Sequence, residues 1–120
     1  MKTQLTHANG SRIFMKKMLL ILVLISFFKL HAQNIHYVKQ NGVGSGGSWA
    51  TAINNLQTAI NNANAGDQVW VAAGTYFSTS SCFKMKNGVK IYGGFPATGN
   101  PTMANRNWET HETIISGNEE

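Results

Sequence analysis

The stretches AGDQVWVAAGTY at residues 65–76 and NGVKIYGGF at residues 87–95 decide the fold that this sequence predicts. Each stretch contains a short run of side chains that favour β-strands, residues 69–72 in the first and residues 89–92 in the second. An Asn-Gly pair opens the second stretch and follows the alternating residues 83–86. Because such a pair between two alternating runs is the typical signal of a two-residue turn, the local pattern favours an antiparallel hairpin.

A weaker repeat over a longer range favours parallel strands instead. The apolar pair at positions 69 and 71 recurs twenty residues later as Val89 and Ile91. A further apolar residue, Ile115, follows Ile91 by twenty-four residues. One short strand per period, with Gly, Asn, Ser and Thr at the corners, is typical of a coiled stack of parallel strands. We therefore expect the two runs to pair in parallel and in register, with the hairpin as the alternative topology.

The residues ahead of the first run predict an amphipathic helix over 48–63, which we expect to lie across the end of the strands. Ser48 is a good N-cap residue, and Gly66 is expected to end the helix at positive φ. The apolar positions of this helix recur at spacings of three, four and three: Ile53, Leu56, Ile60 and Ala63. Further short strands are predicted on both sides of these elements: residues 34–39, 75–77 and 113–116.

Three features resemble binding or reactive sites, but each has a plainer interpretation. The loop at residues 41–47, NGVGSGG, lacks both the GxGxxG and the GxxxxGK[ST] spacing of phosphate-binding loops, so we interpret it as a linker turn. Asp67 has the chemistry of a metal ligand, but a turn carboxylate that bonds its own backbone is the favoured interpretation. Cys82 is the single cysteine, which excludes an internal disulfide, and we expect its side chain to be buried beside Phe83.

The positive charge of the chain is concentrated at its N-terminus. The formal net charge is +5, and residues 1–32 carry five basic residues and no acidic one. From Gln33 onward, five basic residues meet five acidic ones, so this part of the chain is neutral. A neutral segment cannot supply the clustered positive field that phosphate binding requires. We therefore expect no nucleic-acid partner.

Residues 1–32 are interpreted as a leader that contains a signal peptide. Met15 and two lysines form a positive n-region, residues 18–28 form an apolar h-region, and Ala32 is the small residue before a cleavage site at Gln33. Eleven apolar residues in a helix span roughly 16 Å, about half of a hydrocarbon core, which is too short for a membrane-spanning helix. We expect translation to start at Met15, with an extended n-region as the alternative. Contact with the membrane is expected only through this signal peptide.

Four stretches in the exported part occur in an order that resembles a known fold: residues 52–60, 65–76, 87–95 and 113–117. Together they resemble the N-terminal opening of right-handed parallel β-helix proteins, the pectin-lyase-like superfamily. The similarity is strongest to large exported proteins of Bacteroidetes type and to polymorphic outer-membrane proteins, and it covers essentially all of residues 35–118.

The resemblance implies a mainly β fold for residues 33–120. This fold would consist of an N-terminal capping helix and the first rungs of a right-handed single-stranded parallel β-helix. Ile53, Leu56 and Ile60 would cover the apolar lumen at its open end. Because proteins of this family continue through many rungs, we also expect the chain to be truncated.

The sequence offers little support for chemistry. None of the acidic metal ligands or basic proton acceptors of the polysaccharide-cleaving members of the family can be matched, so no catalytic, cofactor-binding or metal-binding residue and no cofactor are predicted. The cluster of Glu109, His111 and Glu112 is the one place for a metal or an acid/base pair, and we interpret it as a solvated loop. Arg106 lies in the same polar connection. Five aromatic residues can stack on sugar rings: Trp49, Trp70, Trp108, Tyr76 and Tyr92.

Two classes of function therefore stay open. The favoured one is a secreted or cell-surface protein, structural or adhesin-like, with an extracellular glycan as partner and no catalysis in this chain. The alternative is the cap region of a polysaccharide lyase or glycoside hydrolase whose catalytic rungs are missing. Both place the protein outside the cell or at the outer membrane. A small binding module built on the hairpin is a third possibility.

Overall fold

A computed structural model describes residues 12–13, 15–20 and 32–117. The chain divides into two units, Met1–His31 and Ala32–Glu120. In the first unit, the described residues are helical and exposed, and the predicted h-region lies outside the described residues beyond Leu20. None of the helices in the described part of the chain is long and apolar enough to cross a membrane.

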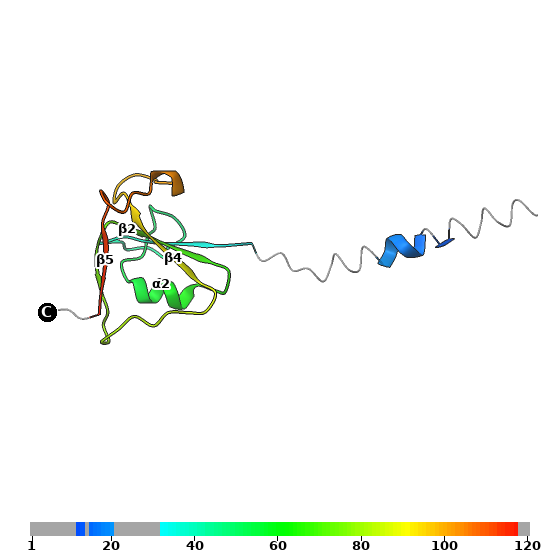
Figure 1. The fold of residues 1–120 in the computed structure, drawn as a ribbon, viewed down its shortest axis with the longest axis horizontal. Helices are drawn as coiled ribbons and strands as arrows, with labels where there is room; N and C mark the ends of the chain where they lie inside the picture. The colour runs from blue at the N-terminus through cyan, green and yellow to red at the C-terminus, as the bar shows by residue number, and fades with distance from the viewer. Residues whose placement is uncertain (1–11, 14, 21–31, 118–120) are drawn as a thin grey trace, which may run out of the picture. The chain divides into compact units, whose positions relative to one another are not determined.

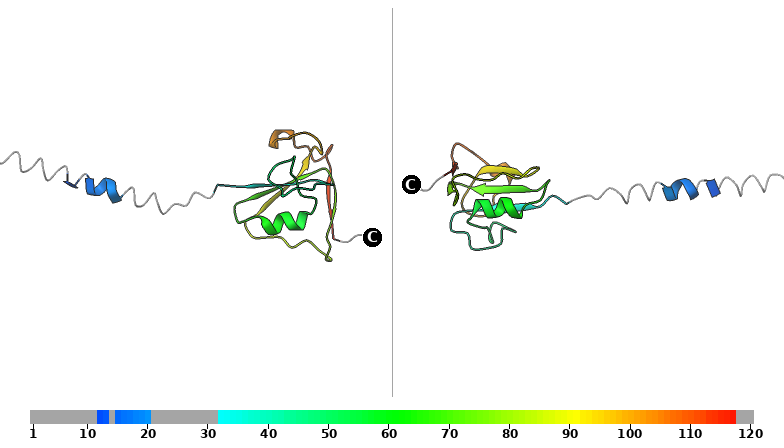
Figure 2. Two further views of the ribbon diagram at one scale, coloured as in Figure 1. Left: turned by 180° about the vertical axis from the view of Figure 1, so that it is seen from behind. Right: turned by 90° about the horizontal axis from the view of Figure 1, so that it is seen from below.

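The second unit contains two small parallel sheets (Figure 1). The larger sheet has three strands in the order β1 (Ile35–Val38), β2 (Gln68–Ala72) and β4 (Lys90–Phe95). The smaller sheet pairs β3 (Gly74–Phe77) with β5 (Thr113–Ser116). Helix α2 (Leu56–Asn62) packs against β1 and β2. The loop with the short 3-10 helix η1 (Met103–Asn105) lies on the other side of the larger sheet (Figure 2).

The predicted parallel pairing is confirmed, and the local hairpin signal was misleading. Strands β2 and β4 pair in parallel, but Val69 lies opposite Ile91 rather than Val89, so the register differs by two residues from the twenty-residue repeat. Residues 83–86 form no strand, because their polar groups contact α2 instead. The Lys84 N–H donates to Gln57 Oε1 at 2.7 Å, and Gln57 Nε2 donates to the Lys84 carbonyl at 3.0 Å. The Asn-Gly pair that follows still forms a turn, but one that leads into a parallel strand.

The prediction of the first rungs of a right-handed parallel β-helix is wrong. The described residues form two separate small sheets of three and two strands, with no solenoid. A solenoid requires successive coils that repeat the same set of strands and turns, so that each coil stacks on the last. Here β4 is followed by the long loop that carries η1, and the register of β2 against β4 shifts between Trp70 and Ala72. The unequal spacing of the apolar repeat reflects this irregularity.

The N-terminal half of the predicted helix over 48–63 is also wrong. Helix α2 begins at Leu56, and its N-cap is Asn55, whose Oδ1 accepts the Thr58 N–H at 2.9 Å. Ahead of it, the Ile53 N–H donates to the Tyr37 carbonyl at 2.9 Å, so Ile53 is held beside β1 in a bridge rather than in a helix. Gly66 has φ of +96°, as predicted, but it serves a turn beyond the helix, which is capped at Ala63.

The glycine-rich loop closes the outer edge of β1. The Gly46 N–H donates to the Thr51 carbonyl at 2.7 Å, and the Gly46 carbonyl accepts the Tyr37 N–H at 2.8 Å. A Cβ atom on Gly44 would lie 2.1 Å from the Thr51 carbonyl oxygen, so the two backbone segments approach too closely for any other residue. The predicted linker turn is therefore an ordered segment that pairs with residues 51–53, and the N–H groups of Gly42, Gly44 and Gly46 donate to backbone carbonyls.

Two clusters of buried side chains hold the unit together. The first lies between α2 and the strands and contains the apolar face of the helix with the inward side chains of the sheets: Val38, Leu56, Ala59, Ile60, Ala63, Val69, Val71 and Tyr76. The second is rich in aromatic rings: Trp49, Trp70, Ala72 and Phe95. The predicted inward face of the helix is confirmed at Leu56, Ile60 and Ala63, because each is at most 2% exposed.

Candidate functional site

Most of the aromatic residues that were candidates for sugar stacking belong to the core. Trp49, Trp70 and Tyr76 are at most 9% exposed. Trp49 Nε1 donates to the Pro101 carbonyl at 2.8 Å, and the Tyr76 hydroxyl donates to the Ala72 carbonyl at 2.9 Å. Burial raises the pKa of Tyr76 to about 12, so its hydroxyl stays protonated. These three rings are therefore not available to a ligand.

Tyr92 is half-buried, with the Arg106 guanidinium over its ring. Trp108 is the exposed one of the five candidates, because it is 72% exposed. It borders a cleft of about 350 Å³ that lies between the end of β4 and the loop before β5. The other side chains and backbone groups of this cleft come from Gly93, Gly94, Arg106, Glu112 and Thr113. We call this group of residues the Trp108 cleft.

The floor of the Trp108 cleft is built on Gly94, which has φ of +83°. The Gly94 N–H donates to Thr113 Oγ1 at 2.9 Å, and its carbonyl accepts the Asn107 N–H at 2.8 Å. A Cβ atom at this position would lie 3.2 Å from the Trp108 backbone and would require a conformation that side chains rarely adopt. Glycine here lets the loop lie directly against β4 and fixes Trp108 at the rim.

Arg106 is held in place beside Trp108. Its Nε donates to the Gly93 carbonyl at 2.5 Å. Its guanidinium carbon lies 5.3 Å from the ring centroid of Tyr92 and 5.9 Å from that of Phe95, within the range of cation–π attraction. Among the described residues, no carboxylate lies within ion-pair distance of Arg106. Its position is therefore ordered while its charge remains available.

The cluster of Glu109, His111 and Glu112 does not form a common centre. Both glutamates are exposed, and the loop between them is organised by Asn107, whose Oδ1 accepts the Glu109 N–H at 3.0 Å. The His111 N–H donates to the Asn107 carbonyl at 2.9 Å. In the part of the chain that the structure describes, no three His, Cys, Asp or Glu side chains are placed to hold a metal ion. Glu112 instead belongs to the Trp108 cleft.

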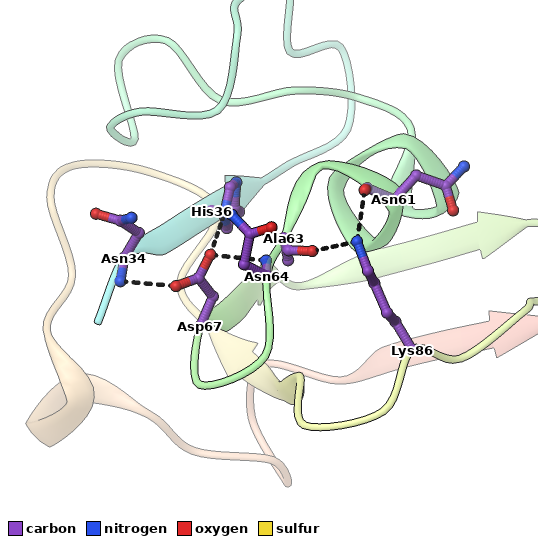
Figure 3. A network of polar contacts seen from close by, with 7 residues as sticks. All are labelled: Asn34, His36, Asn61, Ala63, Asn64, Asp67 and Lys86. Carbon is purple, nitrogen blue, oxygen red and sulfur yellow. Dashed lines mark hydrogen bonds and ion pairs between the residues drawn. The ribbon is translucent and has the colours of Figure 1, made fainter. Parts of the chain in front are cut away.

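Asp67 acts as a turn carboxylate, as predicted (Figure 3). It is 4% exposed, and its Oδ2 accepts the Asn64 N–H at 2.9 Å while its Oδ1 accepts the Asn34 N–H at 3.1 Å. His36 Nε2 lies 3.2 Å from Oδ2. The hydrogen bonds from the backbone of Asn64 and then Asn34 lower the pKa of Asp67. Through these bonds, Asp67 joins the turn before β2 to the start of β1.

Cys82 is the last of the candidates from the sequence. The expected burial of Cys82 beside Phe83 is wrong, because Cys82 is exposed. Its carbonyl accepts a hydrogen bond from the Ser78 hydroxyl at 2.9 Å, which turns the loop outward.

Lys86 Nζ donates to the Asn61 and Ala63 carbonyls, at 3.1 and 2.6 Å, and so stabilises the C-terminal end of α2 (Figure 3).

No protein-family model, curated protein or solved structure matches the chain.

The chemistry of the Trp108 cleft follows from three of its side chains. Trp108 offers an exposed apolar ring, the Arg106 guanidinium offers hydrogen-bond donors, and the Glu112 carboxylate offers acceptors. An apolar face beside donors and acceptors matches the surface of a sugar ring. The sequence named Trp108 and Glu112 as separate candidates, and their placement with Arg106 around one cleft is a result of the fold.

Proposed function

We propose that residues 33–120 form an exported, adhesin-like module that binds an extracellular glycan and has no catalytic role. The exposed ring of Trp108 over a cleft that also contains Arg106 and Glu112 is the observation that carries this proposal. Export is supported by the signal-peptide layout of residues 15–32. The neutral charge from Gln33 onward is compatible with a carbohydrate ligand, which needs local hydrogen bonds rather than a strong field.

The proposed binding mode uses each side chain of the cleft for one task. A sugar ring stacks its apolar face on Trp108, and its hydroxyl groups bond to Arg106 and Glu112. Because Arg106 is already held by Gly93 and by the Tyr92 ring, less conformational freedom is lost on binding. A single shallow cleft of this size should bind with Kd of about 1 mM, so tight adhesion would require several copies on one surface.

Replacing Trp108 by alanine should abolish glycan binding at the Trp108 cleft and leave the fold intact. The ring is 72% exposed, so its loss should change the free energy of unfolding by less than about 0.5 kcal/mol. Loss of the stacking contact between a sugar ring and an aromatic ring should weaken binding roughly tenfold, which takes an affinity in the millimolar range out of the measurable range. A glycan array with the full chain, followed by calorimetric titration of the best ligand, would measure the effect.

The matched control for this variant is Ile114→Ala, because Ile114 is 44% exposed and does not line the cleft. Binding should survive in the control. In the wild-type chain, bound glycan should also shield Trp108 from acrylamide, since the other two tryptophans are already buried. Undiminished binding at this cleft in Trp108→Ala would refute the site, and cleavage of any glycan by the wild-type chain would refute the non-catalytic role.

Export is tested by a separate experiment. Expression of the full chain in a Gram-negative host should produce a periplasmic or secreted protein whose first residue is Gln33. N-terminal sequencing of the purified product measures this directly. Substituting Ala32 by a large residue such as Phe should block cleavage and serves as the control. An uncleaved wild-type chain in the membrane fraction would contradict the proposal.

A further inference from the structure

A second cleft, of about 400 Å³, shares no lining residue with the Trp108 cleft. One wall is formed by the turn after β1 and by the residues just before α2, and the other by β3 and the loop that follows it. Four carboxamide side chains line the first wall: Gln40, Asn41, Asn54 and Asn55. We call this cleft the amide groove.

The lining of the amide groove is polar but uncharged. Opposite the four amides lie Thr75, Phe77 and two further hydroxyl side chains, and none of the described residues of the lining is acidic or basic. A charged ligand placed there would lose hydration without meeting an opposite charge. The groove is therefore suited to a neutral ligand that is rich in hydrogen-bonding groups.

Two of the amides are already oriented by the fold. Gln40 Nε2 donates to the Thr75 carbonyl at 3.0 Å, which leaves Gln40 Oε1 as an acceptor. Asn55 Oδ1 accepts the Thr58 N–H at 2.9 Å, which leaves Asn55 Nδ2 as a donor. One polar atom of each amide group is already hydrogen-bonded, so the side chain is held in place. The other polar atom can therefore bind a ligand with little further loss of side-chain conformational freedom.

The other two amides are uncommitted. Among the described residues, neither the Asn41 nor the Asn54 side chain has a hydrogen-bond partner, and both residues are exposed. Asn41 has φ of +59°, the left-handed conformation that asparagine tolerates better than most residues. These two residues supply complete amide groups, each with a donor and an acceptor side by side.

We propose that the amide groove binds a neutral carbohydrate and is a second site, separate from the Trp108 cleft. Neighbouring hydroxyl groups of a sugar both donate and accept, which matches the paired donor and acceptor of an amide. Phe77 is 44% exposed and provides an apolar ring for the C–H face of the sugar. The absence of charge in the described lining selects neutral sugars over uronic acids and other acidic sugars.

The test follows the side-chain NH₂ resonances of the full chain, labelled with ¹⁵N, during titration with glucose, galactose, mannose and N-acetylglucosamine and with their disaccharides. The Asn41 and Asn54 resonances should shift with at least one of these probes and remain unshifted with glucuronic acid. The double variant Asn41→Gly, Asn54→Ala should weaken that affinity roughly tenfold or more, and glycine keeps the positive φ of position 41 without strain. Asn62→Ala is the matched control, because Asn62 is an exposed amide of α2 outside the lining, and it should bind as the wild type does.

The two sites are distinguished in the same titration. Trp108→Ala should leave the shifts of Asn41 and Asn54 unchanged, even if it removes all binding at its own cleft. The proposal is overturned if no neutral probe shifts these resonances, if glucuronic acid binds more tightly than the neutral sugars, or if the double variant binds as well as the wild type. Loss of the shifts in Trp108→Ala would show a single site and would likewise overturn it.

Discussion

Replacing Phe95 by alanine is expected to lower the free energy of unfolding by about 3–5 kcal/mol. Phe95 is fully buried at the end of β4. Its ring stacks on that of Trp70, with centroids 4.7 Å apart and planes 14° from parallel, and lies 5.4 Å from that of Trp49. Alanine would leave a cavity between two large rings that are anchored in the strand and in the loop, so the site cannot readily collapse.

Chemical denaturation of the wild type and the variant measures this difference. Phe77→Ala is the matched control, since Phe77 is 44% exposed and its loss should cost less than about 1 kcal/mol. Emission from Trp70 and Trp49 should shift to longer wavelength in Phe95→Ala before unfolding, because both rings gain access to water. Equal losses of stability in the two variants would mean that the aromatic cluster is not a core.

Replacing Asp67 by alanine is expected to lower the free energy of unfolding by about 3 kcal/mol. The substitution removes the acceptors of the Asn34 and Asn64 N–H groups and the partner of His36. It therefore loosens the start of β1 and the turn before β2 together. Asp67→Asn, which keeps one acceptor oxygen, should lie between the alanine variant and the wild type.

The contribution of Asp67 should depend on pH in a defined direction. Its pKa is lowered in the folded chain, from the usual value of 3.8, chiefly by hydrogen bonds from the backbone of Asn64 and Asn34. The stabilisation is therefore complete above about pH 4 and is lost as the pH falls through the folded-state pKa. Urea unfolding as a function of pH should show this loss in the wild type and a weaker loss in Asp67→Asn.

The exposed carboxylate of Glu109 provides the control for this experiment. Glu109→Gln should keep both the stability at neutral pH and the acid dependence of the wild type. If the free energy of unfolding of Asp67→Asn fell with pH as much as that of the wild type, the hydrogen bonds at Asp67 would not be what stabilises its ionised carboxylate.

Several strands and turns could be predicted from the sequence alone. The predicted strand over 113–116 agrees with β5, and the run at 69–72 lies within β2, because β-branched and aromatic side chains favour extended backbone whatever their neighbours. The kink before β3 follows from Gly74, which has φ of +144°. The turn role of Asp67 is equally local, since its main partner is three residues away.

Pairing and burial, in contrast, were decided by contacts between distant residues. The Asn-Gly turn is compatible with either topology, and β4 pairs in parallel with β2 because Gln57 binds the segment that a hairpin would have needed. The helix starts late because Ile53 bonds to β1. The β-helix that the resemblance implied was wrong for the same kind of reason: similar short strands can stack as coils or form separate sheets, and the loops between them determine which.

The candidate sites show the same difference between what the sequence alone determines and what contacts between distant residues determine. The prediction that the chain has no nucleic-acid partner rests on the neutral charge from Gln33 onward and refers to no fold, because net charge is a property of the sequence. Which of the three tryptophans faces solvent, and which amides share a groove, depended on how the loops fold back onto the strands. Trp49 and Trp108 are alike in sequence terms, yet one is 5% and the other 72% exposed. Burial depends on neighbours that are remote in the chain, so only the tertiary structure could separate the core ring from the exposed one.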